Sequence, residues 1–205
     1  MKNYKDDSRK TFDEVAIKYE KSCFGRQSRR LHDKVALKAG HFKHESILDL
    51  GCGTGSLLEI LKKYRSKLYG ADISPEMIKY ARERLGNYAE LTVADSEDLP
   101  WEDNSFDIIV CTLSFHHYPD PGKSLIEMKR VLRKNGHVII GEAWLPPLFR
   151  DIANLLIKSR FNKTGDVKVY SKYEWLNMLR IAGFNDIIFE KVGGVFIIIT
   201  ASQSF

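Results

Sequence analysis

The chain has 205 residues, of which 43% are apolar and 29% charged, an ordinary soluble composition and enough length for one α/β domain. Its longest strongly apolar run, 195–201, is far shorter than the roughly 20 residues of a membrane span, and the polar start is unlike a secretory signal. The three cysteines are isolated, which favours a reducing cytoplasm and argues against a structural zinc site.

The net charge of +5 is concentrated in the first part of the chain. Residues 1–46 contain 12 Lys and Arg against 7 Asp and Glu, whereas residues 47–205 contain 20 of each. A basic arm attracts anionic substrates or nucleic acid, but solvated amphipathic helices give the same pattern, and we favour that interpretation. Apolar spacing predicts two helices here, over 11–22 and 27–39.

A glycine-rich turn follows the first predicted strand, 47–50. After the turn come a helix over 56–64 and a strand over 67–71, which delivers Asp72 at its end. Strand, glycine turn, helix, strand and acid form the opening unit of a nucleotide-binding α/β sheet. Without a Cβ the turn lets a ligand approach the backbone, and the acid accepts hydrogen bonds from ribose hydroxyls. The turn glycines are Gly51, Gly53 and Gly55.

The remaining predicted elements alternate before the pattern changes near residue 144. Ser74 is expected to cap a helix that ends near Leu85, and Ser171 to begin another with Glu174 in a capping box. The basic run 133–136 is expected to end a helix with a left-handed cap. The further predicted strands are 90–94, 108–112, 138–141, 187–190 and 195–200, and the further helices are 122–132, 148–159 and 171–182.

We therefore predict a Rossmann-like α/β fold with a seven-stranded, mostly parallel sheet, helices on both faces and a terminal antiparallel strand pair. No internal repeat or flexible linker interrupts the pattern, so the whole chain, 1–205, is expected to be one domain. Its expected parts are N-terminal lid helices (1–46), a nucleotide-binding core (47–143), a substrate-side insertion (144–170) and a C-terminal helix with a strand pair (171–205).

The turn departs from the dinucleotide fingerprint Gly-x-Gly-x-x-Gly, because Ser56 stands at the third glycine position. Asp49, beside the glycines, would repel a pyrophosphate but suits a cationic ligand. These residues resemble the acid-x-Gly-x-Gly-x-Gly motif of class I S-adenosylmethionine (SAM) dependent methyltransferases. The runs 12–19 and 99–107 also resemble that family, most closely its type 11 and ubiquinone/menaquinone-biosynthesis members.

The resemblance implies SAM as cofactor and a methyl transfer by direct displacement, which needs no dedicated nucleophile and no metal. It implies that Tyr19 closes over SAM, although a packed helix-face aromatic explains that residue equally well. Asp95 has an alternative role as a loop acid that caps the following turn. The implied cofactor-binding residues are Asp49 at the amino group; Gly51, Cys52, Gly53, Gly55 and Leu113 around the methionine moiety; Asp72 at the ribose; and Ile73, Met77, Asp95 and Ser96 at the adenine.

The segment after the fourth strand bears on the acceptor. His117 is the candidate general base for a hydroxyl or thiol, with a packing role as the alternative that we favour, and His116 is a weaker candidate. The Asn/Asp-Pro-Pro-aromatic run typical of adenine and glutamine-amide methyltransferases is missing, which disfavours a nucleic-acid base. We expect a small acceptor with an apolar body, enclosed by the N-terminal helices and residues 144–170.

Two other functions remain open at this point. A non-catalytic SAM-binding module would keep the same glycines and Asp72. An NAD-linked oxidoreductase is disfavoured by Ser56 and by the lack of a Tyr-x-x-x-Lys proton relay. The sequence gives no indication of the oligomeric state.

Overall fold

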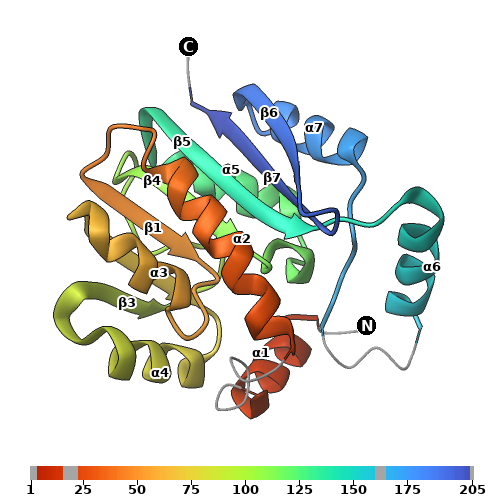
Figure 1. The fold of residues 1–205 in the computed structure, drawn as a ribbon, viewed down its shortest axis with the longest axis horizontal. Helices are drawn as coiled ribbons and strands as arrows, with labels where there is room; N and C mark the ends of the chain where they lie inside the picture. Colours follow the sequence, from red (N-terminus) through yellow and green to blue (C-terminus); the bar gives the residue numbers. More distant parts are fainter. Residues whose placement is uncertain (1–3, 16–22, 160–164, 204–205) are drawn as a thin grey trace.

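A computed structural model describes residues 4–15, 23–159 and 165–203. These residues form a seven-stranded sheet in the order β3-β2-β1-β4-β5-β7-β6 (Figure 1). The first five strands of that order run parallel, and β7 is antiparallel to both β5 and β6, so the predicted terminal antiparallel pair is confirmed. The strands are β1 (Ser46–Leu50), β2 (Lys67–Asp72), β3 (Ala89–Val93), β4 (Phe106–Thr112), β5 (Leu132–Ala143), β6 (Asn185–Val192) and β7 (Phe196–Ser202).

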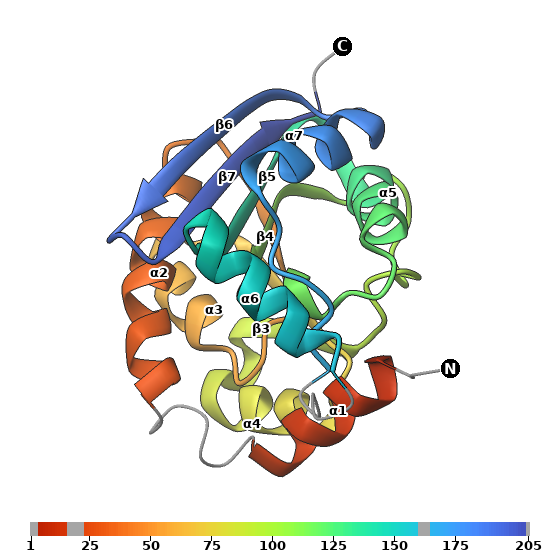
Figure 2. The same ribbon diagram turned by 90° about the vertical axis from the view of Figure 1, so that its right-hand side faces the viewer.

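Helices cover both faces of the sheet, as Figure 2 shows with α2 and α3 on one side and α5 on the other. Central strands are therefore buried on both faces, which explains why β1 and β4 are almost continuous apolar runs. The helices are α1 (Tyr4–Val15), α2 (Cys23–Ala39), α3 (Ser56–Leu61), α4 (Pro75–Leu85), α5 (Pro121–Val131), α6 (Pro147–Ile157) and α7 (Lys172–Ile181), with short 3-10 turns η1 (Lys62–Tyr64), η2 (Gly86–Tyr88) and η3 (Phe115–His117).

Two apolar clusters, one on each face, hold these layers together. Successive residues of β4 alternate between them, with Ile108 and Val110 in the cluster under α2, α3 and α4, and Ile109 in the one under α5 and α7. Trp175 of α7 is 2% exposed and packs against the ring of Phe115, with ring centroids 4.6 Å apart. The second cluster thus reaches directly beneath the segment that follows β4.

Local signals for the helix starts are confirmed. The Ser74 hydroxyl accepts a hydrogen bond from the Met77 N–H at 3.1 Å, and Pro75 occupies the first helical position of α4. Ser171 and Glu174 form both hydrogen bonds of the capping box that begins α7. None of the described helices combines the length and the apolar character needed to span a bilayer.

Several predicted boundaries differ from the structure; the second helix, for example, begins at Cys23 rather than Gln27. The first helix begins at Tyr4 rather than Thr11; its predicted end, 16–22, lies outside the described residues. The basic run 133–136 does not cap α5, which ends at Val131, but belongs to β5. Asn135 donates its N–H to Gln203, and Gly136 accepts one from Gln203, so pairing with the end of the chain draws this run into the sheet. Gln203 is remote in sequence, so local helix and strand propensities could not predict this pairing.

The strand order reverses between β1 and β4, which creates a crevice at the carboxyl ends of the parallel strands. α1 and α6 lie beyond those ends (Figure 1). α1 is attached to α4, since the Ser74 hydroxyl donates to the Asp13 carboxylate at 2.5 Å.

Candidate functional site

A pocket of about 340 Å³ opens at the carboxyl edge of the sheet, at this crevice. Loops after β1, β2, β3 and β4 form its floor, and α1 and α2 supply side chains that close it from above, including Ser8, Phe12 and His32. The expectation that the N-terminal helices cover the site therefore agrees with this arrangement. Tyr19 lies outside the described residues. Of the described residues in 144–170, none lines the pocket.

The three glycines of the turn serve different purposes. All have positive φ, a conformation that glycine adopts without strain. A Cβ on Gly51 would lie 2.0 Å from the Ser114 hydroxyl, and one on Gly55 would lie 2.8 Å from Leu85. Glycine is therefore needed at both positions so that Ser114 and Leu85 can pack against the turn. A Cβ on Gly53 would point into open space, with Met77 Sδ 4.0 Å away as its nearest neighbour. Gly53 is therefore where a ligand can approach the backbone, whereas Gly55 does not line the pocket.

Four N–H groups of the turn already donate hydrogen bonds inside the protein. Those of Gly51 and Cys52 both donate to the Ala71 carbonyl, at 2.8 and 2.9 Å, and that of Gly55 donates to Cys52. The Gly53 N–H donates to the Asp72 carboxylate at 2.8 Å. A pyrophosphate site needs such groups to point at the ligand. These four N–H groups are therefore not free to bind a pyrophosphate.

Asp49, the last but one residue of β1, lies at the bottom of the pocket and is 1% exposed. Neither of its carboxylate oxygens has a hydrogen-bond partner among the described residues. Burial, and secondarily the negative charge of Asp72, raises the pKa of Asp49 to about 8. A buried acid without partners is costly, so its place at the base of a pocket points to a cationic ligand.

Asp72 stands at the end of β2, on the wall of the same pocket. Its two oxygens accept hydrogen bonds from the Gly53 and Ser74 N–H groups at 2.8 and 2.9 Å, which fix the carboxylate in one orientation. Burial raises its pKa to about 6 in spite of those hydrogen bonds. Since an ionised carboxylate offers about four lone-pair directions, Asp72 retains acceptor capacity toward the pocket.

The predicted adenine-binding residues Ile73, Met77, Asp95 and Ser96 all line the pocket. Lys5 of α1 reaches across it and forms ion pairs with Asp95 at 2.6 Å and with Glu97 at 2.8 Å. The Asp95 carboxylate also accepts the Glu97 N–H at 3.0 Å, as the alternative turn-capping role predicts. The lid helix is thus tied to the edge where adenine is expected.

Leu113 and Cys52 also line the pocket. Leu113 has φ of 50°, and its N–H donates to the Gly141 carbonyl of β5 at 2.8 Å. Only its carbonyl is therefore available to a ligand. Cys52 is 7% exposed, and burial raises the pKa of its thiol well above the ordinary value, so it packs as a neutral group.

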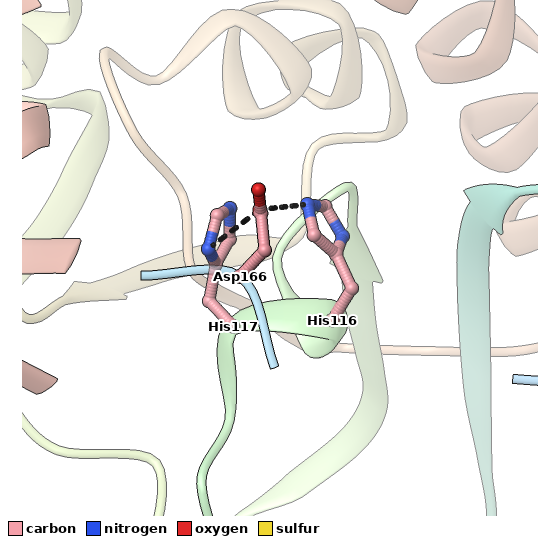
Figure 3. A group of neighbouring side chains, drawn as sticks. All are labelled: His116, His117 and Asp166. Carbon is pink, nitrogen blue, oxygen red and sulfur yellow. Dashed lines mark ion pairs between the residues drawn. The ribbon is translucent and has the colours of Figure 1, made fainter. Parts of the chain in front are cut away.

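His117, the candidate general base, lines the pocket beside Phe12, whose ring meets the imidazole edge-on at 5.0 Å between centroids. Burial and the neighbouring His116 lower the pKa of His117 well below its ordinary value. His116 behaves differently: burial opposes its charge, but Glu142 and Asp166 raise its pKa above the ordinary value. Asp166 lies between the two imidazoles (Figure 3). Asp166 and Glu142 could not be predicted as neighbours of the histidines, because neither is close to them in sequence.

Gly53 offers a test of close ligand approach. We expect Gly53→Ala to weaken SAM binding by at least tenfold, because the added methyl group occupies the space that a ligand would fill. Gly86→Ala is the matched control, since Gly86 has a similar φ of 56° with no atom within 4 Å of its Cβ position and no part in the pocket. Both substitutions place an alanine at a positive φ, where an L side chain is strained. Calorimetric affinities that fall equally in the two variants would refute the assignment.

Comparisons with known proteins agree with this geometry. Residues 48–140 match the family model described as a methyltransferase domain. The demethylmenaquinone methyltransferase of Staphylococcus haemolyticus is 30% identical over 80% of this chain and 74% of its own length, and the Thermotoga maritima protein of the same name is 34% identical over 66% and 61%. Several other curated relatives are matched over only about half of their length.

Solved structures share the fold. A SAM-dependent methyltransferase from Thermotoga maritima superposes with a TM-score of 0.74 over 95% of this chain and 99% of its own, at 24% sequence identity. At 24% identity this similarity supports the overall fold of the chain, with its seven-stranded sheet, and nothing more specific.

Proposed function

Because this chain belongs to the family of SAM-dependent methyltransferases, we propose that it transfers the methyl group of SAM to a small-molecule acceptor by direct displacement. One observation carries the proposal: the buried carboxylate of Asp49, which has no hydrogen-bond partner among the described residues, lies in a pocket where four N–H groups of the turn are already hydrogen-bonded. Such a pocket suits a cation and is poorly suited to a pyrophosphate. This disfavours the NAD-linked alternative.

The residues present fit SAM. Asp49 would pair with the amino group of the methionine moiety, beside the backbone of Gly51, Gly53 and Leu113. Asp72 would accept hydrogen bonds from the ribose hydroxyls, with its orientation already set by Gly53 and Ser74. The adenine would lie against Ile73 and Met77, with Asp95 and Ser96 at its polar edge.

When bound, SAM supplies a methyl group on a sulfonium, which is already a good leaving group. The remaining tasks of the protein are to align the acceptor with the methyl group and to exclude water. α1 serves both, since Phe12 lies over the pocket beside His117, and Lys5 and Asp13 fasten the helix to the loop after β3 and to α4. His117 is the proposed proton acceptor for a hydroxyl or thiol, because its lowered pKa keeps the imidazole neutral at physiological pH.

An apolar acceptor is supported by the surface near the pocket. α6 lies beyond the carboxyl edge of the sheet (Figure 1) and has no buried residue. Relatives are named demethylmenaquinone methyltransferases, which supports an acceptor with a ring and an apolar body. The large apolar side chains that α6 exposes are Leu148, Phe149, Ile152, Leu155 and Leu156.

The proposal is tested in two steps. Calorimetry with SAM and with NAD is expected to give binding of SAM alone. Release of S-adenosylhomocysteine is then measured with quinols, catechols, thiols, amines and tRNA as acceptors, and we expect turnover only with a small molecule that has an apolar body. Methylation of tRNA alone would overturn the acceptor class. SAM binding without turnover on any acceptor would favour the non-catalytic binding module.

A further inference from the structure

We propose that His116, His117 and Asp166 bind one divalent transition-metal ion at the acceptor side of the pocket. Figure 3 shows the two imidazoles of η3 on either side of the Asp166 carboxylate, which comes from the segment between α6 and α7. One potential ligand atom from each of the three side chains lies within 4.8 Å of the other two.

The distances within this cluster suit a metal better than direct hydrogen bonds. Asp166 Oδ1 is 3.3 Å from His117 Nδ1 and 3.6 Å from His116 Nε2. Two ligands bound at about 2.1 Å to one metal lie roughly 3.4 Å apart in tetrahedral geometry and roughly 3.0 Å apart in octahedral geometry. The His117 imidazole interacts with the Gly165 backbone, but its buried Nδ1 has no hydrogen-bond partner within the described part of the chain. A tetrahedral ion between the three groups would satisfy that nitrogen.

Glu142 prepares His116 for this role. Its carboxylate, on a residue only 3% exposed at the end of β5, lies 2.8 Å from His116 Nδ1. If Nδ1 donates its proton there, Nε2 presents its lone pair to Asp166, which is the carboxylate–histidine arrangement found behind metal ligands. A bound metal requires both imidazoles in their neutral form, and the carboxylates of Asp166 and Glu142 would then balance the charge of a divalent ion.

The backbone fixes the cluster. The N–H of Val167 donates to the His116 carbonyl at 2.8 Å, so the chain beside Asp166 is fastened to η3. Two imidazole nitrogens and one carboxylate oxygen favour zinc, cobalt, nickel or ferrous iron over magnesium or calcium, which prefer oxygen ligands alone. Three protein ligands leave a coordination position open, as in catalytic metal sites.

The open position deepens the proposed function, on which this step rests. His117 is the ligand that also lines the pocket, so an acceptor hydroxyl or thiol there could occupy the fourth position. Bound to the ion, the acceptor loses its proton to solvent more readily. Its oxygen or sulfur then forms the bond to the methyl carbon while the carbon–sulfonium bond breaks and its electron pair stays on that sulfur. With a metal bound, His117 acts as a ligand and no longer as the base.

Metal binding is measured on the full chain, stripped with chelator and free of SAM. We expect calorimetry with Zn²⁺ to give one site in the micromolar range or tighter, and Co²⁺ to give the visible spectrum of a four- or five-coordinate nitrogen and oxygen site. His117→Ala and the nearly isosteric Asp166→Asn should each weaken Zn²⁺ binding by at least tenfold. His41→Ala, an exposed histidine outside the cluster, should leave it unchanged, and circular dichroism checks that each variant is folded.

The outcomes separate this inference from the proposed function. Failure to bind Zn²⁺, equal affinity in Asp166→Asn and the parent protein, or a Co²⁺ spectrum with thiolate charge-transfer bands would each overturn the metal site. SAM affinity measured in chelator tests the proposed function independently, because Asp49 and Asp72 are expected to bind SAM without the ion. If the metal-free protein does not bind SAM, and added Zn²⁺ does not restore binding, the proposed methyltransferase function is contradicted. The metal site would be unaffected by that result.

Discussion

Asp72→Asn is expected to weaken SAM binding by about 100-fold or more. Asp72 is the acid that ends β2, and its carboxylate is held toward the pocket by the N–H groups of Gly53 and Ser74. Hydrogen bonds from two ribose hydroxyls to an ionised acceptor contribute roughly 1.5–3 kcal/mol each. An amide has a single acceptor oxygen, so in the variant either the turn or the ribose loses its partner.

Asp107→Asn is the matched control for that experiment. Asp107 also accepts backbone hydrogen bonds, from Glu45 and Ser46, and it pairs with Arg133, but it lies at the start of β4, at the opposite end of the strands from the pocket. We expect this variant to unfold at a lower temperature while its calorimetric affinity for SAM stays within about threefold of the parent. Unaltered affinity in Asp72→Asn, or an equal loss in both variants, would show that the ribose site has been misplaced.

Asp49→Asn is expected to move stability and SAM binding in opposite directions. Because burial raises the pKa of Asp49 to about 8 from 3.8, the folded protein retains a proton that the unfolded chain releases. The contribution of that proton to the free energy of unfolding is fully present below about pH 4 and is lost as the pH rises through 8. The amide cannot ionise, so at pH 8 the ligand-free variant should melt at a higher temperature than the parent. Asp72, with a pKa of about 6, contributes in the same direction and remains in both proteins.

SAM binding should show the opposite effect of the same substitution. An ammonium group that pairs with Asp49 favours its ionised form, so binding to the parent protein releases a proton and tightens between about pH 6 and 8. Loss of one partner from a buried charge pair costs about 2–5 kcal/mol, and we therefore expect at least a 30-fold loss of affinity in Asp49→Asn. Melting curves and calorimetry from pH 5 to 8.5 measure both effects. A variant that keeps the parent's pH profile in both would exclude Asp49 as the ammonium partner.

The predictable part of the site lies close together in the sequence. The turn from Asp49 to Gly55 and the acid at the end of the next strand, Asp72, form one short βαβ unit, whose parallel strands necessarily deliver their carboxyl ends to the same edge. Ser74 and Ser171 cap their helices through partners only three residues away. Such hydrogen bonds can be predicted from the sequence, because the local backbone alone brings the two partners together.

The rest depended on contacts between distant segments. Gln203 draws the basic run after α5 into β5, and Lys5 reaches Asp95 across the pocket. Asp166 meets the two histidines only because the segment after α6 returns to the end of β4. By itself the sequence determined the nucleotide-binding unit, since its residues are neighbours along the chain. Tertiary structure alone decided that four turn N–H groups donate within the protein and which side chains line the pocket, because packing brings those partners together.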